Sequence, residues 1–380
     1  MAVLLWFFII FLACLVIWKA SDGFETASEY LGRNLSEGVR GATINAIGSS
    51  IPELFTTIFF LLILHNQEGF SGGIGTTAGS AIFNAMVIPA AVILAVLFLG
   101  KVRFVKVSRK VIIRDGVMLL VSEFILIYLL SGGTLDWWHG LILMLLYGVY
   151  VVVMFTTMKK QKLQAPDPDE IDVDVDIEPR GFFNSLIRLD LAALLVGPKE
   201  LTAKRAWGLL ILATVVIGAA SAGLVVACEE LGSELNIPVY FVAVILAAAA
   251  TSVPDTVLSI RDAKKGNYDD AVSNALGSNI FDICFALGFP LFLYTIFFNP
   301  IEMTGELLVN VNELRILLFI LTSIVFFIFL FSRKLKVLQG IMLFAIYVFF
   351  VLFVLGKSII AGWVQPIADF LEYIALILLS

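Results

Sequence analysis

Charged residues, histidines and cysteines are scarce in this chain of 380 residues, which has 15% charged residues, 2 His and 3 Cys. Soluble domains carry about 25% charged residues, so this composition excludes an ordinary soluble domain. The scarcity of His and Cys argues against a zinc or copper centre. The three cysteines lie in apolar segments, which argues against a disulfide framework. The chain has no basic stripe and no reader motif, so nucleic acid is not expected as a partner.

Long apolar segments are what the chain has instead. Hydrophobic residues make up 60% of the sequence, and the mean hydropathy is +1.00. Apolar stretches of roughly 18 or more residues recur along the whole length, as spanning helices require. Lipid offers no partner to backbone polar groups, so these stretches must be helical. We predict an all-α membrane protein with ten core transmembrane helices, at 3–20, 37–64, 74–99, 110–130, 138–158, 206–229, 238–262, 269–298, 312–332 and 336–356.

The two halves of the chain repeat each other. Residues 27–35 and 227–235 share five of nine positions at an offset of 200, and nearly the same offset aligns the motifs described below. A repeat of five helices is odd-numbered, so the second copy must cross the membrane in the opposite sense. We therefore predict a 5+5 inverted-topology repeat, with the first copy at 1–158 and the second at 205–357.

Charge in the connections predicts the orientation. Lys and Arg cluster in the connections 99–110, 262–268 and 332–336, whereas 65–73, 131–137, 230–237 and 299–311 contain neither. Because positive charge favours the cytoplasm, the chain should be a multi-pass protein of a plasma or inner membrane with its N-terminus outside.

Two segments lie outside the repeats. The linker 159–204 should be cytoplasmic; it begins basic and continues acidic, with acids alternating with Ile and Val. A short strand and disorder both remain open there. A calcium-sensing loop is the sharper alternative, but the glycine and spacing of an EF-hand are absent, and a solvated linker is preferred. The segment 358–380 is also apolar, and the sequence leaves open an eleventh span or a hydrophobic helix lying on the bundle.

Each repeat places a carboxylate inside an apolar helix. The first repeat reads Gly-Ser-Ser-Ile-Pro-Glu at 48–53, and the second reads Ala-Thr-Ser-Val-Pro-Asp at 250–255. Each has a partner about 25 to 30 residues later, Gly-Ser-Ala-Ile-Phe-Asn at 79–84 and Gly-Ser-Asn-Ile-Phe-Asp at 277–282. An ionisable side chain at bilayer depth costs roughly 2.5–3.5 kcal/mol on insertion scales. A chain that accepts this cost in matching places is expected to use these groups on an ion.

The spacing within the motifs predicts a shell of oxygens. A hydroxyl lies four residues before an acid or amide in every motif, and such residues share a helix face. The pairs are Ser49 with Glu53, Thr251 with Asp255, Ser80 with Asn84, and Ser278 with Asp282. A proline before each acid should also free carbonyls on the preceding turn. The candidate carbonyls are those of Ala46, Ile47, Ala248 and Ala249. Hard cations such as Ca2+ and Na+ prefer all-oxygen shells, and Ca2+ takes 6–8 oxygens.

The charges limit what can bind together. Glu53, Asp255 and Asp282 supply three negative charges when all are ionised. Three Na+ would neutralise them, as would one Ca2+ with one K+, whereas a lone Ca2+ leaves one charge over. Exchange of several monovalent ions for one divalent ion is consistent with this count.

These motifs resemble the alpha repeats of the calcium/cation antiporter superfamily, sodium/calcium exchanger type, over 36–98 and 238–298. The acid at Asp255 together with Asp282 is similar to the potassium-dependent branch. The resemblance implies one Ca2+ or several Na+ at a central site, and it leaves K+ involvement open. No other cofactor is expected, and the protein is expected to act as a monomer in the bilayer. By the same resemblance, Glu53 and Asp255 are the main ligands, and Asn84 and Asp282 are an outer pair. The implied flanking ligands are Ser49, Ser50, Ser80, Thr251, Ser252 and Ser278.

Other functions remain as alternatives. Asn45 and the replacement of the family's glycine by Ala250 motivate a proton-coupled antiporter of Ca2+ or another cation on the same fold. A cation channel is more distant, because a single-chain inverted repeat does not suit an oligomeric pore. A membrane enzyme lacks support, since no nucleophile or cofactor motif accompanies the carboxylates. Glu123 also lies within a span, and the sequence leaves open a gating or proton-carrying role or a polar neighbour.

Overall fold

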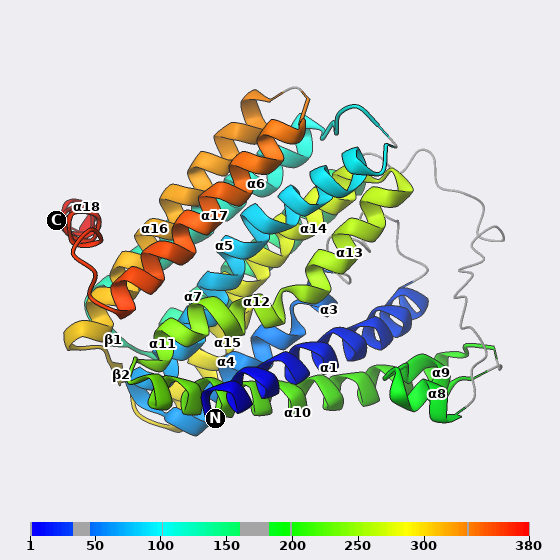
Figure 1. Ribbon diagram of the computed structural model, residues 1–380, viewed down its shortest axis with the longest axis horizontal. Coiled ribbons are helices and arrows are strands. Elements are labelled where there is room, and N and C mark those ends of the chain that lie inside the picture. The colour runs from blue at the N-terminus through cyan, green and yellow to red at the C-terminus, as the bar shows by residue number, and fades with distance from the viewer. Residues whose placement is uncertain are drawn as a thin grey trace.

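The computed structural model describes residues 2–32, 46–100, 102–159, 182–197, 200–332 and 334–379. The described chain is built almost entirely of helices (Figure 1). The helices of the first half are α1 (Ala2–Leu31), α3 (Ala46–Ser49), α4 (Ile51–Leu64), α5 (Asn66–Phe98), α6 (Arg109–Leu129) and α7 (Trp137–Lys159). Those of the second half are α10 (Ala203–Leu235), α11 (Val239–Val242), α12 (Ala248–Thr251), α13 (Val253–Lys265), α14 (Tyr268–Phe281), α15 (Gly288–Phe297), α16 (Gly305–Phe331) and α17 (Val337–Ser358).

These helices confirm the predicted arrangement of five helices, a linker and five more. Eight helical segments of the described residues are long and apolar enough to cross a bilayer. The two remaining core helices are α4, an apolar helix of 14 residues, and α6, whose charged residues lower its hydropathy. The predicted span 37–64 is α3 and α4, and its part at 37–45 lies outside the described residues.

The largest departures from the predicted boundaries are at the start of α5 and the end of α1. The connection expected at 65–73 is a single residue, His65, because α5 begins at Asn66. Gly69 packs so closely on α4 that a Cβ there would lie 2.6 Å from the Phe60 carbonyl oxygen. Tertiary contact therefore carries the helix through a glycine-rich stretch that reads as a loop. Helix α1 likewise continues to Leu31, beyond the predicted end at residue 20.

The motif helices are interrupted at matching places. Ser50 separates α3 from α4, and Ser252 separates α12 from α13. Pro52 and Pro254 stand two residues after these breaks, and proline cannot donate the backbone hydrogen bond that would continue the helix. The same run of the second half has a π-helical segment, η5 (Ala243–Ala247), and a second one, η6 (Asp282–Ala286), joins α14 to α15. Such irregular turns are frequent at functional sites.

Short strand pairings tie the two repeats together at both ends of α6. After α6, strand β1 (Thr134–Leu135) pairs antiparallel with β2 (Ile301–Glu302), with Leu135 opposite Ile301. Before α6, Val105 forms an antiparallel bridge with Leu335. Leu335 lies 200 positions after Leu135, and Ile301 lies 196 after Val105. The two pairings are therefore one contact repeated by the inverted symmetry.

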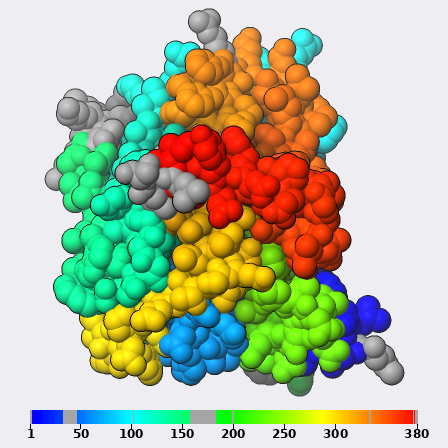
Figure 2. Space-filling model, turned by 90° about the vertical axis from the view of Figure 1, so that its left-hand side faces the viewer, coloured from blue at the N-terminus to red at the C-terminus, as the bar shows by residue number. Residues whose placement is uncertain are grey.

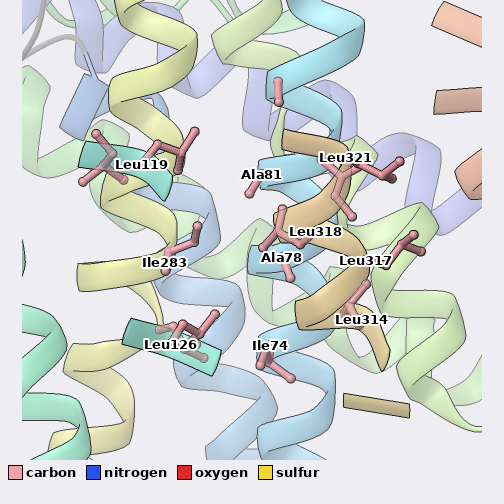
Figure 3. Packing of buried hydrophobic residues seen from close by; sticks show 14 of the residues in the cluster. Ile74, Ala78, Ala81, Leu119, Leu126, Ile283, Leu314, Leu317, Leu318 and Leu321 are labelled. Carbon is pink, nitrogen blue, oxygen red and sulfur yellow. The ribbon is translucent and has the colours of Figure 1, made fainter. Parts of the chain in front are cut away.

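Helices α1 and α10 form a pair along one edge of the bundle (Figure 1). Their apolar side chains pack in two clusters of their own, one containing Ile17 and Cys228, the other Ala20 and Ala213. The main core lies between the other helices. Figure 3 shows Ile74 and Ala78 of α5 facing Leu314 and Leu318 of α16.

Small residues let α5 approach the second repeat closely. A Cβ on Gly79 would overlap the Val244 carbonyl oxygen and lie 2.8 Å from the Ala248 Cβ. A Cβ on Gly75 would lie 3.2 Å from the Tyr240 carbonyl oxygen. Close backbone contact of this kind is typical of membrane helix interfaces.

The linker and the tail contain helices as well. Within the predicted linker, α8 (Phe182–Ile187) and α9 (Leu191–Leu195) are described, and α9 packs on α1 and α10. This end of the linker is therefore not purely solvated, because Leu191 and Ala193 are buried there. The acidic run at 166–179 lies outside the described residues. In the tail, α18 (Gln365–Leu379) lies crosswise to the core helices and against α16 (Figure 2). Its 15 residues are fewer than the roughly 20 that a span needs.

Candidate cation site

The polar residues of the four motifs meet in the interior. Apart from Ser49, which is 6% exposed, the polar site side chains are completely buried. The fully buried members are Ser50, Glu53, Ser80, Asn84, Thr251, Ser252, Asp255, Ser278 and Asp282. They come from the breaks in the two interrupted helices and from the facing turns of α5, α14 and η6. The repeats therefore bring their carboxyl groups together, and none of these groups points at lipid.

Ser80 is the hub of this cluster. Its Oγ lies 3.1 Å from Glu53 Oε1, 2.8 Å from Ser252 Oγ and 3.0 Å from Asp282 Oδ2. One hydroxyl of the first repeat thus contacts an acid of each repeat. A hydroxyl has a single proton, so it can donate to only one of these oxygens at a time and must offer lone pairs to the other neighbours.

Asn84 connects the hub to the second acid. Its amide Nδ2 donates to Asp255 Oδ2 at 3.4 Å, and it lies 3.3 Å from Ser80 Oγ and 3.5 Å from Asp282 Oδ2. Ser278 donates to Asp255 Oδ1 at 2.7 Å. Glu53 and Asp255 are therefore linked through two side chains of α5, as the sequence predicts for acids that serve one site.

The helix breaks alter how the hydroxyls are shared. The spacing predicts that Ser49 and Glu53 share one face of a helix, and that Thr251 and Asp255 share a face of another. In the structure Ser49 approaches Asp255 and Thr251 approaches Glu53, across the interface between the repeats. The break that follows each hydroxyl turns it towards the opposite acid.

Several site oxygens have no hydrogen-bond partner. These buried atoms are Ser50 Oγ, Glu53 Oε2, Asn84 Oδ1 and Asp282 Oδ1. A buried polar atom without a partner is unfavourable by about 1–3 kcal/mol. Oxygens left in this condition around three acids are what an incoming cation would satisfy.

The acids alone do not form a metal cage. Among the described residues, no three His, Cys, Asp or Glu side chains are grouped closely enough to hold a metal ion. The shell is instead mixed, because hydroxyl and amide groups lie between the carboxyls. The three acids still lie within electrostatic range of one another. A mixed oxygen set suits Na+ and Ca2+, which accept neutral and charged oxygen ligands alike.

The backbone contribution differs from the expectation. The Ala248 carbonyl accepts hydrogen bonds from the Ser252 amide at 3.1 Å and from Thr251 Oγ1 at 3.2 Å, so proline does not free it. Pro254 has no N–H group, so the carbonyl that loses its helical hydrogen bond is the one four residues earlier, that of Ala250. In the first repeat, Ala46 begins α3, and only its backbone is described.

Sequence reasoning missed other buried polar contacts. Asn279 donates to the Ala81 carbonyl at 3.0 Å and so ties α14 to α5. Its position inside the motif at 277–282 is the signal that could have marked it. Arg315 is completely buried in α16 and donates to the Ile127 carbonyl at 2.8 Å. Glu123, by contrast, was already marked by the sequence as an acid within a span; it is buried in α6 beside Thr322, outside the cluster around Ser80.

Comparison with known proteins places these features in a family. A family model described as "Sodium/calcium exchanger protein" matches residues 4–156 and 205–356. Sodium/potassium/calcium exchanger 4 of Mus musculus is 38% identical over 128 residues, which are 34% of this chain and 19% of that protein. Sodium/potassium/calcium exchanger 5 of Homo sapiens is 27% identical over 353 residues, 74% of this chain and 68% of the relative. The chain thus spans about a fifth of the length of the first of these relatives.

Solved structures share the fold. The crystal structure of the H+/Ca2+ exchanger CAX superposes with a TM-score of 0.62 at 15% identity and covers 97% of this chain and 92% of that one. The sodium–calcium exchanger NCX_Mj, soaked with Na+ and Sr2+, gives a TM-score of 0.55 at 22% identity, covering 91% and 97%.

Proposed function

Because this chain belongs to the sodium/calcium exchanger family, we propose that it is a secondary antiporter that exports Ca2+ in exchange for Na+. The observation that carries the proposal is the linkage of Glu53 and Asp255 through Ser80 and Asn84, where the two inverted repeats meet. Carboxyl groups buried in matching places of opposed half-molecules suit a site that opens alternately to the two sides.

The proposed ligands follow from the contacts. Glu53 and Asp255 bind Ca2+ and share in Na+ binding, and Asp282 with Asn84 forms the outer pair. The hydroxyls of Ser49, Ser50, Ser80, Thr251, Ser252 and Ser278 complete the shell, with the carbonyl of Ala46 as a further oxygen. The Ala248 carbonyl is left out of the proposed shell, because it already accepts two hydrogen bonds. In the present hydrogen-bonded state Ser80 Oγ occupies the middle of the cluster, so ion binding requires its contacts to Glu53 and Asp282 to open.

Potassium is a proposed co-substrate. Matched relatives carry potassium in their names, and the third acid, Asp282, supplies the extra charge that one K+ would balance beside one Ca2+.

The remaining features are proposed together. The protein is a transporter without enzymatic activity or a further cofactor and acts as a monomer in the bilayer. Its N-terminus is outside, and the 159–204 linker is cytoplasmic.

Vesicle flux tests the proposal. In vesicles loaded with Na+, an outward Na+ gradient should drive uptake of 45-calcium, and Glu53→Gln should abolish it by removing a ligand charge. Glu306→Gln makes the same chemical change at an exposed position of α16 and should retain uptake. Retained uptake in Glu53→Gln would show that Glu53 is not the main ligand and would contradict the proposal.

Gradients imposed one at a time separate the coupling ions. Na+, K+ and H+ gradients are applied in turn to the same vesicles. Uptake driven by a pH gradient without Na+ would favour the proton-coupled alternative, and single-channel currents would favour a channel. A dependence of Na+-driven Ca2+ uptake on K+ would support the proposal that K+ is a co-substrate.

A further inference from the structure

A narrow cavity lies directly beside the central site. It lies between α1, α3 and α13 and has an enclosed volume of about 10 Å3, which is room for about one water molecule. Ser49 of the central site forms part of its wall. Its other lining residues include Trp18, Ser21, Asp22, Glu25 and Pro254. An ion that leaves Asp255 past Ser49 would enter this space first.

The cavity is acidic, and one arginine covers its acids. Arg261 of α13 contacts Asp22 through Nη2 at 2.8 Å and Glu25 through Nη1 at 3.3 Å. Lys19 contacts Asp22 from within α1 at 3.3 Å. The side chains of Arg261, Asp22 and Glu25 are 45%, 29% and 22% exposed, so this end of the cavity reaches the surface.

A further polar group points to a ligand in the cavity. Ser21 lines it, is only 6% exposed, and its Oγ has no hydrogen-bond partner. A buried hydroxyl without a partner beside two carboxylates completes a set of oxygens that a passing cation can use. A purely structural tie between α1 and α13 explains the arginine contacts but not the cavity or the unpaired hydroxyl.

We propose that this cavity is the cytoplasmic entrance of the transport path, with Asp22, Glu25 and Ser21 as a transient cation site for which Arg261 competes. The proposal rests on the proposed function and orientation, which place the basic end of α13 on the cytoplasmic side. When Arg261 pairs with the two acids, the entrance is neutralised. When a cation displaces Arg261, the acids hold the cation one step from Ser49.

The competition has a predictable size. Removal of the arginine charge leaves one of the two acid charges unbalanced over a few ångströms of partly hydrated space, since Lys19 still contacts Asp22. The local concentration of a monovalent cation should then rise by about three- to tenfold. A matched loss of charge elsewhere on the same side should have little effect. Arg205 offers this control, since its Nη1 donates to the exposed Glu200 carbonyl outside the cavity.

Thiol labelling tests the entrance without relying on transport. Ser21→Cys is introduced, and the parent chain measures the background from its native cysteines. The labelling rates by a cationic and an anionic methanethiosulfonate, added from the side of the linker, are compared. The ratio should favour the cationic reagent and rise about three- to tenfold when Arg261→Gln is added. It should fall with Asp22→Asn and Glu25→Gln, and stay unchanged with Arg205→Gln. Arg261→Lys keeps the charge and should preserve the parental ratio.

Calcium provides the second readout. Millimolar Ca2+ should slow labelling of Ser21→Cys more strongly when Arg261→Gln is also present than in Ser21→Cys alone. Equal ratios in Arg261→Gln and Arg205→Gln, or no labelling from the linker side, would overturn the entrance. If the Ser21→Cys variants show the labelling pattern but the parent chain shows no Na+-driven uptake, the proposed exchange fails and the cation entrance stands. If uptake is normal but the ratios do not respond to Arg261, the exchanger stands and the entrance fails.

Discussion

Gly79→Ala should be among the most damaging single-methyl changes in the membrane interior. Gly79 lies in the middle of α5, one residue before the hub Ser80. An added Cβ would overlap the Val244 carbonyl oxygen and lie 2.8 Å from the Ala248 Cβ. Both neighbours are backbone or the first side-chain atom, so neither can rotate away.

The magnitude follows from two opposing effects. Carbon atoms pack best at about 3.5–4.0 Å, so α5 and the facing helix must part by about 1 Å. Overpacking of this kind costs about 1–3 kcal/mol. Replacing Gly by Ala within a helix also stabilises the helix by about 1 kcal/mol, because alanine has the higher helix propensity. Gly223→Ala in α10 is the matched control, because nothing lies within 4 Å of its added Cβ. It should be neutral or stabilising by up to about 1 kcal/mol.

The assay is thermal unfolding of purified protein in detergent, followed by vesicle flux. Gly79→Ala should lower the apparent midpoint relative to Gly223→Ala. It should also reduce Ca2+ uptake at least tenfold, because a shift of about 1 Å displaces the Ser80 hydroxyl from its three contacts. Equal midpoints and equal uptake for the two variants would refute the close contact between α5 and the Val244–Ala248 turn.

Two further predictions follow from the contacts. Ser80→Ala should weaken Ca2+ binding, measured by calorimetric titration, by roughly 10–100-fold, because it removes a proposed ligand oxygen and polar contacts to charged groups contribute about 1.5–3 kcal/mol. Ser278→Ala, which loses one hydrogen bond to Asp255, should weaken Ca2+ binding less; the reverse order would remove Ser80 from the centre of the site. Lys357→Met should lower the unfolding midpoint by leaving Glu313, 5% exposed, without its 2.9 Å partner, a loss of roughly 2 kcal/mol. Adding Glu313→Gln should restore the midpoint, and no recovery would show that Lys357 contributes through packing alone.

Hydropathy and the internal repeat were sufficient to predict most of this fold. The bilayer allows only helices, so ten apolar segments translate directly into ten core helices. The offset near 200 then dictates the inverted arrangement. The start of α5 was predicted at residue 74, eight residues too late, because hydropathy falls over the polar and glycine-rich stretch before it. The small size of Gly69, Gly72 and Gly73 lets that stretch lie on α4 as helix.

The candidate site was predictable in its members and less so in its geometry. The motifs identify the acids and hydroxyls that the structure brings together. They do not reveal the breaks at Ser50 and Ser252, which turn Ser49 and Thr251 towards the acid of the opposite repeat. The cavity beside Asp22 and Glu25 was also beyond sequence reasoning, since it depends on α13 crossing α1 and bringing Arg261 from more than 200 residues away.

The duplicated pairing of Leu135 with Ile301 and of Val105 with Leu335 bears on the origin of the chain. Each half contributes one strand segment to the pairing at each end of α6. One half alone would therefore leave both of its segments unpaired. A half-length ancestor could satisfy them only as a homodimer whose two copies inserted upside down relative to each other. Fusion of the two genes would have made that mixed insertion obligatory, and later divergence could then give each half its own acids.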